Sequence, residues 1–191
     1  MTTQPSYADR HRAAAARFTE VVEGVRDWDV PTPVKEWTAR DVVAHLVEWF
    51  PGFLQGGSGE RLEPGPSVTE DPVGAWAHQR DQVQALLEDE SRAGATYRSE
   101  MLGEMPLGQL VDQFYTADVF MHTWDLARAT GQDDTLDERV VAPMYEGMRG
   151  MEQMIRGSGQ FGEEQPVADD ASLQDRFIAF IGRDPAWAPP V

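Results

Sequence analysis

The chain has 191 residues, of which 41% are hydrophobic and 26% are charged, a composition typical of a single globular domain. Its net charge of −17 argues against binding to nucleic acid or to anionic membranes, because both carry negative charge themselves. No apolar run is long enough to span a bilayer, and the first residues lack the features of a signal peptide, so we expect a cytoplasmic protein.

The first part of the chain predicts two helices separated by a loop with two prolines. Residues 6–24 form the first helix, with Ser6 as its N-cap. Residues 38–41 (Thr-Ala-Arg-Asp) resemble a capping box and open the second helix. We expect this second helix to end near residues 51–52, where proline is followed by glycine. One of its faces carries Val42, His45, Leu46 and Trp49.

The middle of the chain combines a long loop, a third helix and a stretch without helical spacing. Residues 56–66 hold four glycines and two prolines, which predicts a loop long enough to be functional or mobile. Asp71 and Pro72 start the third helix, which ends by about Gly94. Residues 96–105 alternate poorly, so we expect extended structure or a short hairpin there.

The last part of the chain predicts three further helices. Pro106 opens a long one that runs to Gly131, a natural C-terminal cap. A fifth spans about residues 137–156, and a short last helix covers residues 172–181 after a linker rich in Gly, Glu and Pro. We therefore expect one all-α domain over residues 1–191, built as a helical bundle.

A pair of polar residues in the long helix is the sharpest indication of function. Asp118 and His122 are four residues apart, so their side chains share one face of the helix. The apolar stripe through this face consists of Val111, Phe114, Leu126 and Ala129. An unpaired buried carboxylate is unfavourable, and a metal ion is one partner that satisfies both residues. His45, on the inner face of the second helix, is the natural third ligand; the alternative is a hydrogen-bonded core histidine.

The chain has no cysteine, so a metal site must use His, Asp or Glu. Two histidines and one carboxylate leave positions open for water or substrate and fit Zn(II), which we favour, or Ni(II) or Fe(II). Asp125 either orients a ligand or pairs with an arginine such as Arg128. We expect Trp49, Tyr115 and Met121 around the ligands, as pocket walls or as core. His11, near a fraying end, and His78 have no predicted role.

Three segments resemble a known family: residues 37–47 (WTARDVVAHLV), 117–131 (ADVFMHTWDLARATG) and 180–185 (FIGRDP). They look like the DinB-like superfamily, and within it the actinobacterial metal-binding branch related to the N-terminal domain of mycothiol-dependent maleylpyruvate isomerase. The resemblance implies a four-helix bundle, up-down-down-up with a long crossover, that binds one divalent metal. It places the ligands at His45, Asp118 and His122. Many relatives carry His or Glu where this chain has Asp118.

The resemblance also implies a chemistry. Characterised relatives use the metal to activate a low-molecular-weight thiol of the mycothiol type, which they transfer to an electrophile or use to isomerise a substrate. We therefore expect a metal-dependent thiol transferase or isomerase-like enzyme, with a small thiol and an electrophile as partners, and a homodimer. The alternatives are a non-catalytic metal-binding or stress-related dimer, a non-haem iron oxygenase, and an enzyme that uses the bundle cavity without a metal.

Overall fold

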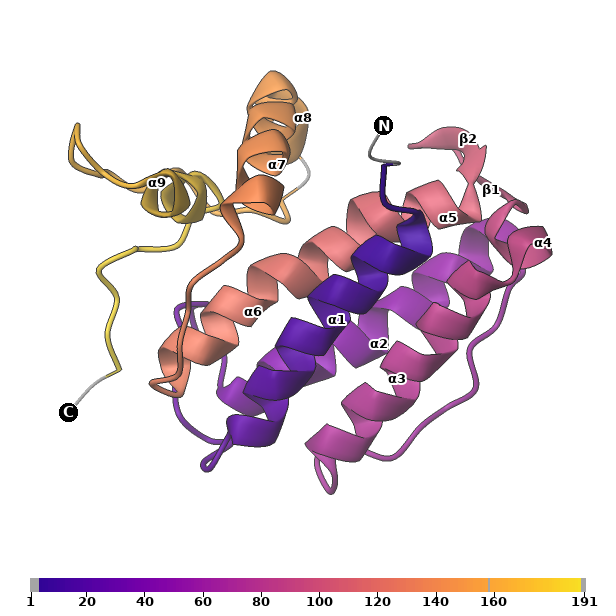
Figure 1. The fold of residues 1–191 in the computed structure, drawn as a ribbon, viewed down its shortest axis with the longest axis horizontal. Helices are drawn as coiled ribbons and strands as arrows, with labels where there is room; N and C mark the ends of the chain where they lie inside the picture. Colours follow the sequence, from indigo (N-terminus) through magenta and orange to yellow (C-terminus); the bar gives the residue numbers. More distant parts are fainter. Residues whose placement is uncertain (1–3, 158, 190–191) are drawn as a thin grey trace.

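The computed structural model describes residues 4–157 and 159–189 and shows a mostly helical protein with one small hairpin (Figure 1). The long helices are α1 (Tyr7–Gly24), α2 (Ala39–Ser58), α3 (Pro72–Glu88), α6 (Ala117–Ala129) and α7 (Glu138–Gly150). The shorter elements are α4 (Glu90–Ala93), the strands β1 (Thr96–Ser99) and β2 (Gly103–Pro106), α5 (Leu107–Leu110), the π-helix η1 (Val111–Thr116), α8 (Glu152–Gly157) and α9 (Leu173–Phe180). Within the described ranges, no helix combines the length and the apolar character that a membrane crossing requires.

The predicted helix starts and the predicted hairpin are confirmed. Ser6 and Thr38 each cap their helix in a capping box, in which the cap side chain and the third helical residue bind each other's backbone amides. Asp71 caps α3, with proline at its first position. Strands β1 and β2 pair in antiparallel register, with Thr96 opposite Pro106.

The prediction that the second helix ends near residues 51–52 is wrong. Helix α2 continues through Pro51 to Ser58, where Gly59 takes the left-handed conformation of a C-cap. The ring of Pro51 removes one backbone hydrogen bond. Phe50 and Leu54, on the inner face of this last part, are fully buried, and their burial outweighs that loss. The loop predicted over residues 56–66 therefore begins only after the helix ends.

Other predicted helices are divided at positions that carry no helix-breaking residue in the sequence pattern. The long helix after Pro106 contains the π-helix η1, with α5 before it and α6 after it. It ends as predicted, because Gly131 has a φ of 67°. The fifth helix is broken at Met151 into α7 and α8, and the third ends at Glu88, before the separate turn α4.

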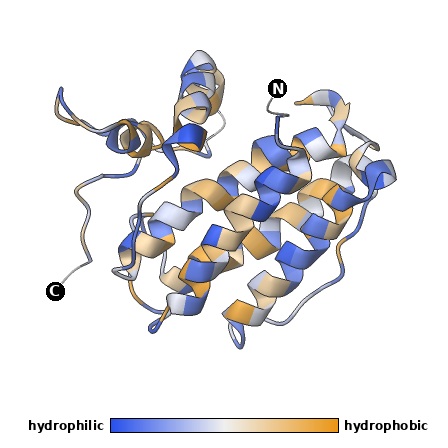
Figure 2. Cartoon of the chain, viewed as in Figure 1, coloured by the Kyte–Doolittle hydropathy of each residue, from blue (hydrophilic) through white to orange (hydrophobic). Residues whose placement is uncertain are grey.

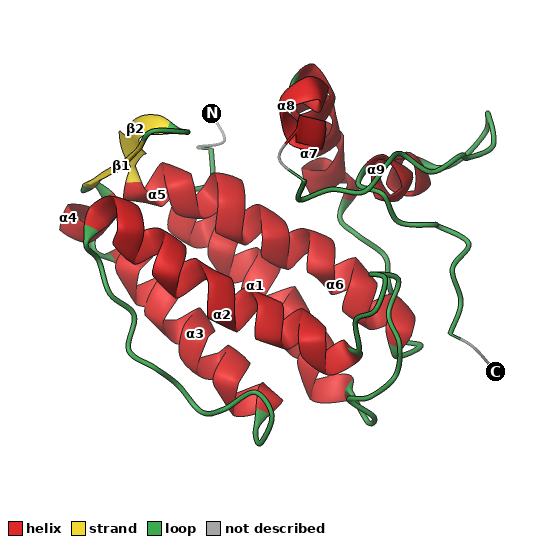
Figure 3. Cartoon of the chain, turned by 180° about the vertical axis from the view of Figure 1, so that it is seen from behind, coloured by secondary structure: helices red, strands yellow, loops and turns green. Residues whose placement is uncertain are grey.

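Helices α1, α2, α3 and α6 lie side by side around the main apolar core (Figure 1). Helix α1 packs against α3 and α6, and α2 packs against the same two helices. Residues 59–71 connect α2 to α3 along the outside of this layer (Figure 3). Hydrophilic residues recur along the outward faces of α1 and α3, which leaves the apolar residues for the core (Figure 2).

A second apolar cluster covers the other side of α6. It joins Phe120, Met121 and Trp124 of α6 to residues of α7 and α9, among them Val141 and Phe177. Residues 119–127 of α6 are therefore all buried, between the main core and this C-terminal layer. The polar residues of this stretch must consequently find their partners inside the protein.

Gly131 and Gly52 give a matched pair of stability tests, because Gly131 has a left-handed backbone conformation and Gly52 lies inside a helix. Gly131→Ala should lower the free energy of unfolding by about 1 kcal/mol, because an L side chain is strained at its positive φ. Gly52→Ala, in the middle of α2, should raise it by about 0.5–1 kcal/mol, because alanine favours a helix interior. A new Cβ meets no atom within 4 Å at either position. Urea unfolding measures the free energy of unfolding of both variants. Changes of the same sign would contradict the left-handed conformation of Gly131 or the helical conformation of Gly52.

Candidate metal centre

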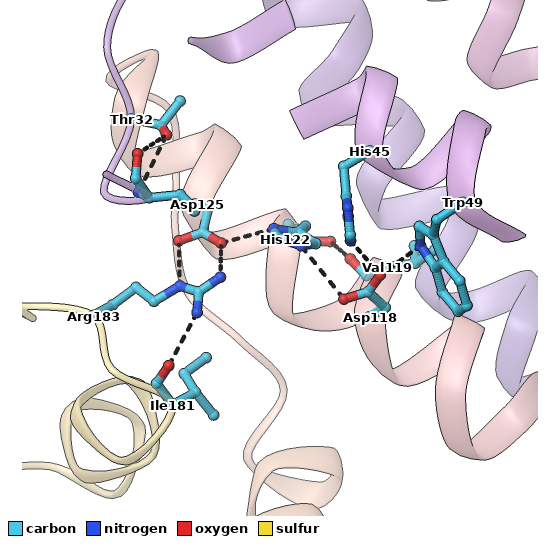
Figure 4. Close-up of polar contacts among 11 residues, drawn as sticks. Thr32, His45, Trp49, Asp118, Val119, His122, Asp125, Ile181 and Arg183 are labelled. Atoms are coloured by element: carbon cyan, nitrogen blue, oxygen red, sulfur yellow. Dashed lines mark hydrogen bonds and ion pairs between the residues drawn. The ribbon is translucent and has the colours of Figure 1, made fainter. Parts of the chain in front are cut away.

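The contact between α2 and α6 brings His45 next to Asp118 and His122 (Figure 4). Asp118 and His122 are one turn apart on α6 and point to the same side, while His45 reaches them from α2. One ligand atom of each residue lies within 4.8 Å of the other two. The structure thus places the three residues predicted as ligands in one cluster.

The carboxylate of Asp118 is the centre of this cluster. Its Oδ2 lies 2.9 Å from Nε2 of His45 and accepts a hydrogen bond of 3.1 Å from the indole Nε1 of Trp49. Its Oδ1 lies 3.4 Å from Nε2 of His122. Three side chains from two helices therefore fix the position of one carboxylate.

The charges of the cluster stabilise one another. Burial alone would raise the pKa of Asp118, but His122 and His45 outweigh it and hold that pKa below its ordinary value. Burial would likewise lower the pKa of His122, but the charge of Asp118 and hydrogen bonds to Asp118 and Asp125 raise it to about 9. Without a metal, the two residues therefore form an imidazolium–carboxylate ion pair at neutral pH.

Asp125 fixes the other side of the His122 ring. Its Oδ2 lies 2.8 Å from Nδ1 of His122, so Nε2 is the nitrogen that faces Asp118. Asp125 is completely buried, and its charge is matched by the guanidinium of Arg183 at 3.1 Å. Burial would raise the pKa of Asp125, but Arg183 and His122 lower it. The partner is thus Arg183 and not Arg128, whose Nε pairs with Asp134.

Trp37 forms an aromatic wall over the two histidines. Its ring centroid lies 5.0 Å from that of His45 and 5.6 Å from that of His122, nearly parallel to the latter. The loop before α2 holds it in place, because its backbone carbonyl accepts from the amide of Thr32 and its amide donates to Val34. The indole therefore shields the buried histidine from solvent on that side.

The donor set fits a divalent ion of the zinc type, which binds imidazole nitrogen and carboxylate oxygen. Around a tetrahedral ion with bonds of about 2.1 Å, ligand atoms are about 3.4 Å apart. Oδ1 of Asp118 lies 3.4 Å from Nε2 of His122 and Oδ2 lies 2.9 Å from Nε2 of His45, and one ligand atom of each residue lies within 4.8 Å of the other two. Side-chain shifts on the order of 1 Å therefore bring the three residues to the spacing of ligands around one ion. The side chains of His45 and Asp118 keep 25% and 18% of their exposure, so one side of the cluster stays open to a further ligand.

The remaining residues predicted near the site are distributed differently. Tyr115 lies in the main core, stacked on Phe50 with ring centroids 4.2 Å apart, and burial raises the pKa of its hydroxyl. Met121 belongs to the C-terminal cluster. His11 is not at a fraying end: it is fully buried, with Nδ1 2.8 Å from Gln84. His78 lies at the surface and contacts the carbonyl of Glu63.

Two residues of the site received no role from the sequence, Trp37 and Arg183. Both stand inside the segments 37–47 and 180–185, so the signal for them was present in those motifs. The contact between Arg183 and Asp125 joins residues 58 positions apart, and no local spacing predicts such a contact.

The fold and this cluster define a mostly helical protein with a candidate His/Asp metal site. A sequence model described as the mycothiol maleylpyruvate isomerase N-terminal domain matches residues 11–127, and the chain belongs to this family. Two relatives, the uncharacterized proteins MT0763 and Rv0738 of Mycobacterium tuberculosis, are each 32% identical over 179 residues, 91% of this chain and 95% of their own length. No solved structure matches the chain.

The raised pKa of His122 predicts how metal binding depends on pH. Nε2 can ligate only after it loses its proton, and in the metal-free protein that proton is held up to a pKa of about 9. Zinc affinity should therefore rise about tenfold per pH unit from about pH 7 and level off above about pH 9. Competition with a chromophoric chelator in a series of buffers measures this slope. A dissociation constant independent of pH over this window would contradict the prediction.

Proposed function

We propose that this protein binds one divalent metal ion through His45, Asp118 and His122 and uses it to activate a small thiol for attack on an electrophile. The observation that carries the proposal is the convergence of two imidazoles on one partly buried carboxylate, with one side of the cluster open. Membership of a family named after a mycothiol-dependent isomerase supports a thiol as the co-substrate. We choose zinc as the ion, because it binds such nitrogen and oxygen ligands.

The same proposal includes the topology of the DinB-like bundle. In it, α1, α2, α3 and α6 form the four helices and run up, down, down and up. Two observations support this arrangement. Each of the helices α1 and α2 packs against both α3 and α6, and the long connection over residues 59–71 allows α3 to follow the direction of α2.

The protein's own residues prepare the site for this chemistry. Trp49 donates a hydrogen bond to Asp118 and so fixes the carboxylate before any ion arrives. Asp125 holds His122 with Nε2 toward the open cluster. Trp37 covers the histidines and lowers the access of water to them. A preorganised set of ligands of this kind needs little rearrangement when an ion binds.

The reaction follows from thiol chemistry. A bound divalent ion would lower the pKa of a thiol beside it and so supply the thiolate, the reactive nucleophile, at neutral pH. The thiol proton goes to solvent, and the sulfur electron pair forms a new bond to the electrophilic carbon. In a transfer, a leaving group departs with its own electron pair. In an isomerisation, the π electron pair of a conjugated double bond moves onto the electron-withdrawing group as sulfur adds, and the resulting single bond rotates. The electron pair then returns to re-form the double bond and expels the thiolate, which takes a proton back from solvent.

Metal content of histidine variants tests the proposal. Protein purified without a metal-affinity tag and loaded with zinc should hold about one equivalent, and His45→Ala should hold almost none, because two remaining ligands bind weakly. His78→Ala is the matched control, since its imidazole lies at the surface and contacts only a backbone carbonyl among the hydrogen bonds of the described residues. Elemental analysis after gel filtration measures all three proteins.

The zinc-loaded protein should also accelerate the reaction of N-acetylcysteine with 1-chloro-2,4-dinitrobenzene, and His45→Ala should lose this acceleration. Release of the dinitrophenyl thioether is followed by its absorbance. A full equivalent of zinc in His45→Ala would contradict the ligand assignment. Stoichiometric zinc without any thiol-dependent rate, over a panel of thiols and electrophiles, would favour a non-catalytic metal-binding protein instead.

A further inference from the structure

The C-terminal tail (residues 173–185) contacts the buried carboxylate of Asp125 on α6 through the side chain of Arg183. Arg183 lies three residues after the end of α9, and a sharp turn at Gly182, with a φ of 90°, redirects the chain toward α6. A Cβ at Gly182 would lie 2.6 Å from the backbone of Gly162, so only glycine fits this turn. The amide of Arg183 donates to the carbonyl of Ile178, which closes the end of α9. The backbone conformation at residues 182–183 therefore directs the side chain of Arg183 toward α6.

The guanidinium of Arg183 binds both oxygens of Asp125 (Figure 4). Nε donates to Oδ1 at 3.3 Å and Nη2 to Oδ2 at 3.1 Å, while Nη1 donates to the carbonyl of Ile181 at 3.0 Å. The side chain of Asp125 has no exposure and that of Arg183 has 13%. A bidentate ion pair of this kind fixes the plane of the carboxylate and also balances its charge.

The orientation of Asp125 decides which nitrogen of His122 can bind a metal. An ionised carboxylate only accepts hydrogen bonds, so its contact of 2.8 Å with Nδ1 requires the proton to sit on Nδ1. The lone pair of the neutral ring is then on Nε2, which faces Asp118. Arg183 therefore acts on the metal site through two other residues.

We propose that Arg183 is a positioning residue of the metal centre, and that docking of the C-terminal tail and binding of the metal strengthen each other. This inference rests on the metal site proposed above. Arg183 lies outside residues 11–127, which the family match covers, so the tail completes a site whose ligands all lie within that match. Coupling between two events is reciprocal, and each raises the equilibrium constant of the other by the same factor.

Zinc affinity of arginine variants tests the inference. Arg183→Gln should weaken zinc binding about 10- to 100-fold, the usual effect of losing a partner that orients a metal ligand. Arg183→Lys, which keeps the positive charge but cannot form the bidentate ion pair, should recover part of the lost zinc affinity. Arg128→Gln is the matched control: Arg128 binds the same tail at the carbonyl of Pro185 but pairs with Asp134 and not with Asp125. Its affinity should stay within about threefold of the wild type.

Circular dichroism and thermal unfolding of the metal-free variants show whether the fold is kept. Wild-type affinity in a folded Arg183→Gln, or an equal loss in Arg128→Gln, would overturn the inference. Hydrogen exchange of the wild type gives a second test that needs no variant. Saturating zinc should slow the exchange of amides in residues 173–183 by about the factor by which Arg183→Gln weakens zinc binding, and at least about tenfold.

Exchange rates in residues 173–183 that do not change with zinc would also overturn the inference, whether or not the arginine variants fold. Zinc binding by the wild type distinguishes a failure of this inference from a failure of the proposed function. If the wild type binds no divalent metal, the metal site itself is wrong and the role of Arg183 is wrong with it. If the wild type binds zinc and only the coupling is missing, the site stands and the positioning role is wrong.

Discussion

A carboxylate that is partly buried between two helices needs partners, and the partners of Asp118 come from both of these helices. His45 and Trp49 approach from α2, and His122 lies one turn further along α6. These contacts fix the register of α2 against α6, because sliding either helix by one turn would remove His45 and Trp49 from the carboxylate. The same contacts therefore determine both the packing of the two helices and the geometry of the candidate metal site. A divalent ion would replace the ion pair by bonds to the same three groups without a new arrangement of the helices.

The C-terminal layer, which consists of α7, α9 and the residues after it, adds contacts on the other side of α6. Because it covers the second side of α6, the polar residues His122 and Asp125 lie inside the protein, and the charge of Asp125 is matched by His122 and by a second cation that comes from the covering layer. Arg183 supplies that cation. The chain thus builds its site in two steps of packing: the main core brings the ligands together, and the tail fixes the ring of one of them.

Local features of the structure could be predicted from the sequence, because they depend on neighbouring residues. The capping boxes at Ser6 and Thr38, the proline start of α3, and the shared face of Asp118 and His122 all follow from spacing of three or four residues. Features that depend on packing could not. Helix α2 passes Pro51 because its last turns bury large side chains, the π-helix η1 has no periodic signature, and Arg183 meets Asp125 only through the tertiary fold.

Zinc K-edge X-ray absorption, before and after addition of a small thiol, shows which atoms bind the ion and whether a thiol joins them. If zinc binds through His45, Asp118 and His122, the protein alone should show a first shell of nitrogen and oxygen at about 2.0–2.1 Å, with the scattering pattern of two imidazoles. After addition of thiol, the shell should include one sulfur at about 2.3 Å. A shell without two imidazoles would contradict the assignment of His45 and His122. An unchanged shell at saturating thiol would contradict the claim that the open side of the cluster receives the nucleophile.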